Sequence, residues 1–150
     1  MASIEVEIKQ KRFRSEHDKA LVNVLYTANW MYSANAAVLK QYGITPEQFN
    51  VLRILRGSHP NLMKLGDITS RMLDKNSNAT RLVEKLRLKQ LVHREICPTN
   101  RRQVDITITD AGLKLLEEID SQWESKFQRG LALSASEAEQ LNHLLDKMRG

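Results

Sequence analysis

The stretch from Asn76 to Thr109 decides the fold of this chain: NSNATRLVEKLRLKQLVHREICPTNRRQVDITIT. In its first part apolar side chains recur at helical spacing, which predicts an amphipathic helix of about 15 residues and roughly 22 Å. Asn76 is the expected N-cap of this helix. A helix of this length fits the major groove of DNA. The inward side chains are Leu82, Val83 and Leu86, and the polar or basic residues largely outside this stripe are Ser77, Asn78, Thr80, Arg81, Lys85 and Lys89.

The second part of the stretch predicts a β-hairpin. Side chains alternate between two faces in residues 91–96, and residues 104–109 alternate more cleanly between apolar and polar, as half-buried strands do. The turn between the strands, residues 98–102, carries Arg101 and Arg102 at a solvent-facing tip. Adjacent arginines there are able to follow phosphates or enter a narrow minor groove. The order of helix, strand, turn and strand predicts a winged helix.

Positive charge is concentrated in the same region. Between Arg71 and Arg102, nine Lys and Arg residues stand against three acids, a net charge of +6, whereas the whole chain carries +5. All other residues together therefore sum to −1. Such an electrostatic footprint favours nucleic acid as the partner.

Other interpretations of the basic segment are open. A basic helix face can be merely solvated, and some winged helices are protein-interaction modules without specific DNA binding. The combination of a basic helix with an arginine-bearing turn favours DNA over both.

An enzyme is the alternative from another class. The four histidines lie in different elements without the spacing of metal ligands or catalytic groups. They are His17, His59, His93 and His143. The sequence contains neither a nucleophile elbow nor a glycine-rich phosphate loop. We therefore expect no catalysis, no cofactor and no bound metal.

Four motifs between Thr80 and Gly112 carry a resemblance to a known family: TRLVEKL, VHRE, PTNRR and VDITITDAG. They resemble the recognition helix, wing and post-wing signature of the MarR family of bacterial winged helix-turn-helix transcription regulators. The resemblance extends from about Ala20 to Met148. It implies a homodimer, double-stranded DNA as partner, and a small effector, often aromatic or anionic, held where the dimer helices meet the winged helix.

Two residues depart from the pattern of that family. Gln90 stands where a glycine commonly ends the recognition helix. Asn100 stands where an acidic residue usually precedes the paired basic residues of the wing.

The segments before the basic helix complete a helix-turn-helix. TPEQ at residues 45–48 predicts an N-cap, a proline at the first helical position and a capping box. We expect this helix to end at Gly57, residues 62–64 to pair with the wing, and residues 66–73 to form a short helix. The inward side chains of these two helices are Phe49, Leu52, Leu55, Ile68 and Met72.

Long amphipathic segments flank the winged helix. Residues 16–41 predict one helix, and residues 110–149 predict two, the first running to about residue 129 behind a Thr109 cap and the second starting at Ser134. Their apolar stripes exceed what one small winged helix can bury, so a second copy of the chain is expected to cover them. The stripes comprise Leu21, Val24, Leu25, Ala28, Met31, Val38, Leu113, Leu116, Ile119, Trp123, Phe127, Leu141, Leu144, Leu145 and Met148.

The expected fold class is mainly α with a small β-hairpin wing (α+β), as a single MarR-type domain over residues 1–150. Its parts are an arm at 1–15, frayed or packed across a partner, dimerisation helices at 16–41 and 110–149, and the winged helix-turn-helix at 45–109. No apolar run is long enough to span a membrane, and the N-terminus lacks the pattern of a secretion signal. A single cysteine suits a reducing cytoplasm.

A two-fold dimer would place two basic helices in successive major grooves, so the expected operator is a pseudo-palindrome with half-sites about 10 base pairs apart. Repression is expected before activation because excluding polymerase requires no further contact. The expected DNA-binding residues are Lys75, Asn76, Ser77, Asn78, Thr80, Arg81, Lys85, Arg101 and Arg102.

The sequence also offers candidates for regulation. Tyr26, Trp30 and Arg53 are candidates for effector contact, although core or dimer packing is the favoured explanation for the two aromatic residues. Cys97, at the end of a wing strand, is expected to be structural rather than a redox sensor.

Overall fold

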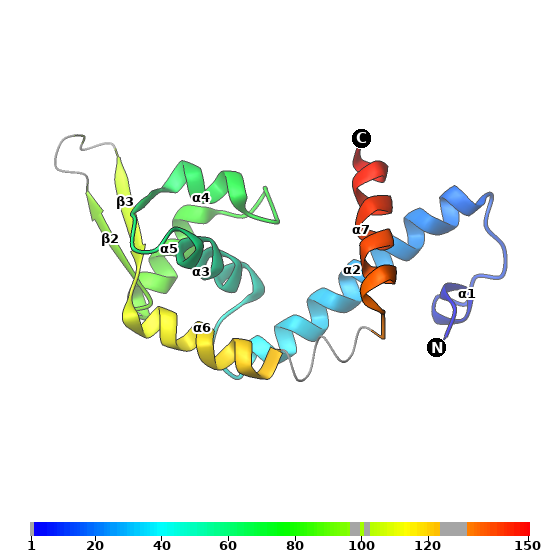
Figure 1. Ribbon diagram of the computed structural model, residues 1–150, viewed down its shortest axis with the longest axis horizontal. Helices are drawn as coiled ribbons and strands as arrows, with labels where there is room; N and C mark the ends of the chain where they lie inside the picture. Colours follow the sequence, from blue (N-terminus) through cyan, green and yellow to red (C-terminus); the bar gives the residue numbers. More distant parts are fainter. Residues whose placement is uncertain (1, 97–99, 101–102, 124–131) are drawn as a thin grey trace.

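Figure 1 shows the computed structural model of this chain, which describes residues 2–96, 100, 103–123 and 132–150. The described elements, in chain order, are α1 (Ile4–Glu7), α2 (Glu16–Lys40), α3 (Pro46–Ser58), β1 (Met63–Lys64), α4 (Leu65–Arg71), α5 (Ala79–Leu88), β2 (Val92–Ile96), β3 (Val104–Ile108), α6 (Asp110–Trp123) and α7 (Ala135–Arg149). The predicted mainly helical fold with a small wing is confirmed. None of the described helices is long and apolar enough to cross a bilayer.

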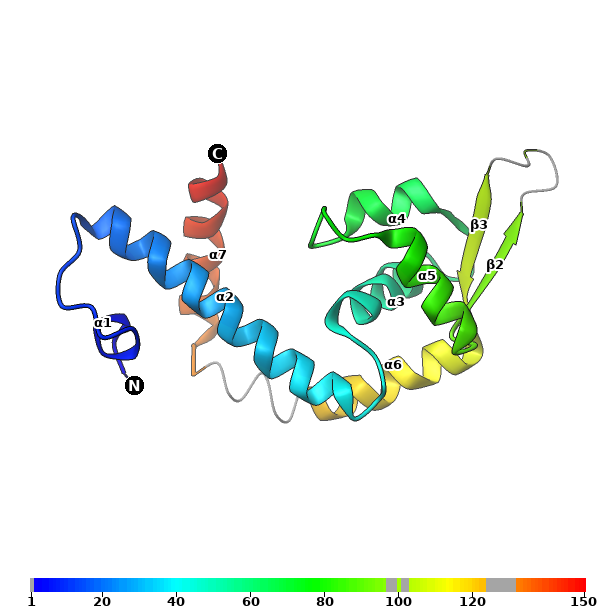
Figure 2. The same ribbon diagram turned by 180° about the vertical axis from the view of Figure 1, so that it is seen from behind.

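The strands form one antiparallel sheet in the order β1–β3–β2. Met63 pairs with Ile106, which confirms the short strand expected beside the wing, and Val92 pairs with Ile108. Since β3 lies in the middle, β2 is an edge strand on the side of α5 (Figures 1 and 2).

The capping box expected before α3 is present. The Thr45 hydroxyl accepts from the Gln48 backbone N–H at 3.3 Å, and the Gln48 side chain accepts from the Thr45 N–H at 3.2 Å.

The expected stop at Gly57 is wrong, because α3 continues to Ser58. The short helix expected at residues 66–73 is α4, which ends earlier, at Arg71.

One apolar core joins α3, α4, α5, the sheet and α6. Burying each large side chain of this core contributes roughly 1.5–3 kcal/mol. Its fully buried members include Leu52, Leu55, Ile68, Leu86, Ile106, Leu116 and Ile119. Because Leu116 and Ile119 lie in this core, the first part of the 110–129 stripe is covered by its own winged helix, which corrects the expectation that a second copy would be needed there. Phe127 lies outside the described residues.

The other apolar stripes stay uncovered in the protomer. Helix α2 leaves the core and runs to the end of the molecule opposite the wing (Figures 1 and 2), and only Leu39 on it is buried. No residue of α7, all of which is described, is buried. Leu25 on α2 is 57% exposed and Leu144 on α7 is 61% exposed.

The N-terminal arm folds back on its own chain. Ile4 is buried, the Lys19 ammonium lies 2.5 Å from the Glu5 carboxylate, and the Tyr26 hydroxyl donates to Glu7 at 2.8 Å. The hydrogen bond from Lys19 lowers the pKa of Glu5 to about 2. The expectation of a frayed arm is therefore wrong for these residues, and packing across a partner stays a prediction.

A tight junction joins the end of α5 to the start of α6. The Thr109 hydroxyl donates to the Gln90 carbonyl at 2.8 Å and accepts from the Gly112 N–H at 3.0 Å, so Thr109 caps α6 as predicted. The Thr109 N–H also donates to the Leu91 carbonyl at 3.1 Å. A side chain at Gly112 has no room here, since its Cβ would lie 2.4 Å from the Leu91 carbonyl oxygen and 2.7 Å from Ile108 Cγ1.

We expect Gly112→Ala to lower the free energy of unfolding by about 1–3 kcal/mol, because the backbone carbonyl opposite cannot move aside without breaking the junction. The matched control is Gly57→Ala in α3, where nothing lies within 4 Å, and a gain of about 0.5–1 kcal/mol is expected. Urea unfolding at one fixed protein concentration measures both. Equal unfolding free energies for the two variants would contradict the tight junction.

Candidate nucleic-acid interface

The turn between α4 and α5 is held by its own side chains. The Asp74 carboxylate accepts from the Asn76 N–H and from the Ser77 hydroxyl, both at 2.9 Å. The Leu73 N–H donates to Asn50 Oδ1 at 2.9 Å, which fastens the turn to α3. Such local side-chain bonds compete with helix formation and keep the chain in a turn.

Helix α5 consequently begins later than expected. Asn78 is its N-cap, with Oδ1 accepting from the Arg81 N–H at 3.0 Å, so the prediction of Asn76 as N-cap is wrong. The helix has 10 residues, Ala79–Leu88, which gives it a length of about 15 Å rather than 22 Å. It is still long enough to lie in a major groove.

The two faces of α5 divide cleanly. Ala79, Val83 and Leu86 are buried, and Leu82 is half-buried. Thr80, Arg81 and Lys85 are exposed on the other side. Of the remaining expected DNA-binding residues, Lys75, Asn76 and Asn78 are exposed, Ser77 is half-buried, and Arg101 and Arg102 lie outside the described residues.

Lys89 is committed elsewhere. Its ammonium group donates to the Gly43 carbonyl in the loop after α2. This bond ties the C-terminal end of α5 to the C-terminal end of α2, and it removes Lys89 from the free polar face that the sequence indicated.

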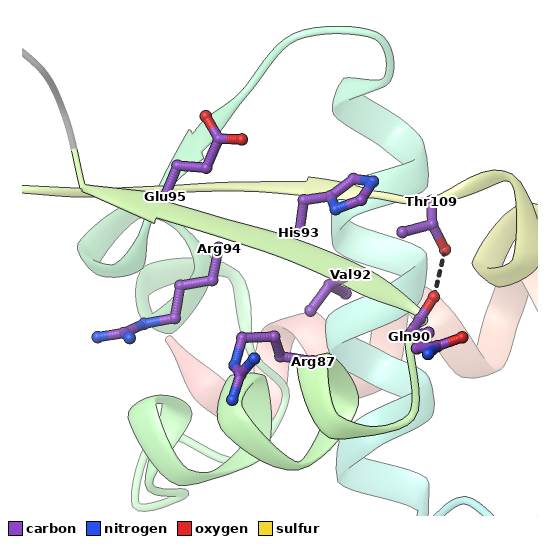
Figure 3. A pocket seen from close by; sticks show the side chains of 7 residues that line it. All are labelled: Arg87, Gln90, Val92, His93, Arg94, Glu95 and Thr109. Carbon is purple, nitrogen blue, oxygen red and sulfur yellow. Dashed lines mark hydrogen bonds between the residues drawn. The ribbon is translucent and has the colours of Figure 1, made fainter.

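A cleft of about 440 Å³ separates the end of α5 from β2 (Figure 3). Arg87 and Arg94 extend in the same direction beside it. Arg87 forms a forked ion pair with Glu84, with Nη2 2.7 Å from Oε1, and this hydrogen bonding lowers the pKa of Glu84. Sequence reasoning counted both arginines as charge but did not place them in the interface. The spacing of Glu84 and Arg87 by three residues was a signal for the pair.

The effector candidates do not come together. Tyr26 and Trp30 line a cleft of about 300 Å³ between α1 and α2. Arg53 lines a separate cleft of about 420 Å³ between α2, α3 and the turn before α5. In that second cleft the Tyr32 hydroxyl donates to Glu47 at 2.7 Å, and this bond raises the pKa of Tyr32. Cys97 lies outside the described residues.

Comparison with known proteins places this arrangement of α4, turn, α5 and wing in a family. The model of the MarR family matches residues 44–104. The chain is also 30% identical over 113 residues to the HTH-type transcriptional regulator MhqR of Bacillus subtilis, a match that covers 73% of this chain and 75% of MhqR. This chain belongs to the MarR family. A further relative is the HTH-type transcriptional repressor MdtR of Bacillus subtilis, 32% identical over 73% of this chain and 70% of MdtR.

Solved MarR structures share the fold. A MarR transcription factor from Planctomyces limnophilus is 32% identical, with a TM-score of 0.70 over 92% of this chain and 98% of that one. MepR of S. aureus, in complex with DNA, is 25% identical, with a TM-score of 0.75 over 91% of this chain and 97% of MepR. BpsR of Bordetella bronchiseptica, whose DNA binding is regulated by 6-hydroxynicotinic acid, is 25% identical, with a TM-score of 0.66 over 85% of this chain and 99% of BpsR. These MarR relatives are transcription regulators, not enzymes.

The assignment of Asn78 as the N-cap of α5 can be tested directly. We expect Asn78→Ala to lower the free energy of unfolding by about 1 kcal/mol, because it removes the acceptor for the first turn of α5. Asn76→Ala is the matched control and should change it by less than about 0.5 kcal/mol, since only the backbone of Asn76 is bonded within the turn. Thermal or urea unfolding distinguishes the two. A larger loss of unfolding free energy for Asn76→Ala than for Asn78→Ala would show that Asn76 is the N-cap.

Proposed function

We propose that this MarR-family chain is a homodimeric, sequence-specific DNA-binding regulator that represses transcription from a pseudo-palindromic operator. The observation that carries the proposal is the two-faced α5, in which a buried apolar face holds Thr80, Arg81 and Lys85 outward. Residues 45–109 would form the DNA-binding unit. The basic surroundings of α5 would attract the DNA backbone, and short polar side chains would face base edges.

The role proposed for each residue follows from the length of its side chain and from the hydrogen-bonding groups that are still available on it. Arg81 is long enough to reach guanine or a phosphate, and Thr80 and Asn76 have side chains suited to base edges. Asn78 uses Oδ1 for the cap and retains its amide N–H groups, while the Ser77 hydroxyl is bonded to Asp74. Lys85 would contact phosphate, and so would Lys75, whose ammonium group donates to the Ser70 carbonyl and would exchange or share that bond. Arg101 and Arg102 are proposed for the neighbouring minor groove.

Dimerisation is supported by the apolar surface at the other end of the molecule. The stripes of α2 and α7 lie far from α5 and would be covered by the same stripes of a second copy, as a two-fold interface requires. The dimerisation segments would thus be 16–41 and the α7 part of 110–149. A two-fold axis between two winged helices would set the half-sites about 10 base pairs apart.

Repression is the simpler direction of regulation. A bound dimer excludes polymerase from an overlapping site without any further contact. The relative MdtR is named a repressor, which supports the same direction here.

The deciding experiment is selection of random duplex DNA by the purified full-length protein, followed by sequencing of the retained duplexes. We expect a palindromic motif, blurred at one position per half-site by Arg81→Ala and weakened uniformly by Arg101→Ala/Arg102→Ala. The control is Lys114→Ala on the exposed face of α6, which should retain the motif and the affinity of the wild type.

Two results would count against the proposal. Failure of any motif to enrich would indicate a protein-interaction module or a solvated basic face. A motif with a single, unrepeated half-site would contradict the dimer.

We further propose that a small aromatic or anionic effector binds in the cleft lined by Arg53 and thereby causes the protein to release DNA. This cleft touches α2 on one side and Leu73, Asp74 and Ser77 of the turn before α5 on the other. A ligand there would contact both the proposed dimerisation helix and the start of the DNA-reading helix. Its apolar walls suit an aromatic ring, and Arg53 is the cation that a ligand carboxylate would approach.

A panel of small aromatic acids tests the effector proposal, with operator affinity as the readout. Active compounds should weaken DNA binding by about 5- to 150-fold, the range of a coupling free energy of 1–3 kcal/mol. Arg53→Ala should abolish the response, and Trp30→Ala, in the separate cleft against α1, should leave it intact. The reverse pattern would move the effector to the cleft of Tyr26 and Trp30.

A further inference from the structure

The cleft between α5 and β2 holds two arginines to which the proposed operator contacts assign no role. Arg94 lies on the edge strand and Arg87 lies near the end of the recognition helix, and both line the cleft. The role inferred for them rests on the proposed DNA binding. It adds the surface between α5 and β2 to the proposed DNA contacts.

Strand geometry turns Arg94 toward α5. Side chains alternate along a strand, and Val92, two residues earlier on the same face, is 2% exposed and packs into the core. His93 and Glu95 therefore point to the opposite face of β2, as Figure 3 shows, and they line the cleft from that side. Arg94 reaches past the edge of the core and lies exposed beside Arg87.

Helix geometry turns Arg87 toward β2. Glu84 and Arg87 are three residues apart and so share one flank of α5, and Arg87, nearer the end of the helix, lines the cleft against β2. The forked bond to Glu84 fixes the orientation of the Arg87 guanidinium. None of the ion pairs among the described residues includes Arg94, although its positive charge adds to that of Arg87 in lowering the pKa of Glu84.

The position of the cleft determines what can fill it. When α5 lies in a major groove and the wing reaches the neighbouring minor groove, the sugar-phosphate backbone of the DNA that separates the two grooves must pass between α5 and β2. Double-stranded DNA carries one negative charge per about 1.7 Å of its axis, so phosphates arrive at this place whatever the base sequence. A guanidinium group matches a phosphate with two parallel hydrogen bonds.

We propose that the cleft between α5 and β2 is a phosphate clamp, in which Arg94 binds the DNA backbone between the two grooves and Arg87 supports it from the helix side. Glu84 holds Arg87 in place and reduces its charge toward DNA. The clamp contributes affinity and fixes the register of the winged helix, but it does not read sequence.

The test uses the full-length protein and two duplexes, its selected operator and a scrambled sequence, with dissociation constants measured from 50 to 300 mM salt. Arg94→Gln should weaken binding to both duplexes by the same factor. The slope of the logarithm of the association constant against the logarithm of the salt concentration is negative. Its magnitude should decrease by about 0.9 for each lost phosphate contact, or about 1.8 for a dimer. Lys114→Gln on the exposed face of α6, a residue with no proposed contact to DNA or to a second copy, changes the net charge equally and should leave the slope unchanged.

Two further variants sharpen the result. Arg94→Lys retains the charge without the fork and should restore most of the slope while binding more weakly than the wild type. Glu84→Gln should strengthen binding to both duplexes, because it frees the charge of Arg87. Unchanged melting temperatures would show that these exposed substitutions leave the fold intact.

The outcomes separate the clamp from the proposed function. A wild-type protein that binds neither duplex overturns the DNA-binding proposal itself. If the wild type binds but Arg94→Gln leaves the slope unchanged, only the clamp is overturned. The clamp is also overturned if Arg94→Gln weakens operator binding alone, since Arg94 would then read bases, and the role given to Glu84 is overturned if Glu84→Gln fails to strengthen binding.

Discussion

One-sided burial of α5 is the constraint on which the proposed DNA-binding surface depends. Val83 and Leu86 are almost completely buried, so the helix cannot rotate about its axis without exposing them to water. Exposing two such side chains would cost roughly 3–6 kcal/mol, a large share of the stability of a small domain. The outward direction of Thr80, Arg81 and Lys85 is therefore enforced by the core and needs no contact of their own.

Both ends of α5 are also fixed along its axis. Asp74 and Asn78 define where the helix starts, and the turn is fastened to α3 through Asn50. At the other end, Gln90 adopts a left-handed conformation with φ 61°, which costs a non-glycine residue about 1–2 kcal/mol. The junction to Thr109 and the Lys89 bond to Gly43 offset this strain. These bonds connect the end of α5 to α2 and α6, so a shift of either helix would move the end of α5. Regulation through the proposed dimerisation helices requires such a connection.

The distribution of charge and apolar surface follows the same division. Arginines and lysines gather around α5 and β2, and the uncovered apolar stripes lie on α2 and α7 at the other end of the molecule. The surface proposed for DNA and the surface proposed for a second copy therefore do not overlap. The membership in the MarR family, whose solved structures include a DNA complex, agrees with this arrangement.

The sequence by itself determined the elements whose signals are local. Periodicity within α5, alternation within β3 and the capping boxes before α3 and α7 depend on neighbours in the chain, so they could be read without coordinates. Asp74 also acts locally, because it bonds to Asn76 and Ser77 and keeps Ser77 out of α5, although this effect was not predicted. Only the tertiary structure decided that Glu5 and Glu7 would bind α2 of their own chain, and that Leu116 and Ile119 would be buried within the protomer. It alone set Arg94 beside Arg87. Each of these outcomes depends on which groups meet in space, and composition and spacing do not contain that information.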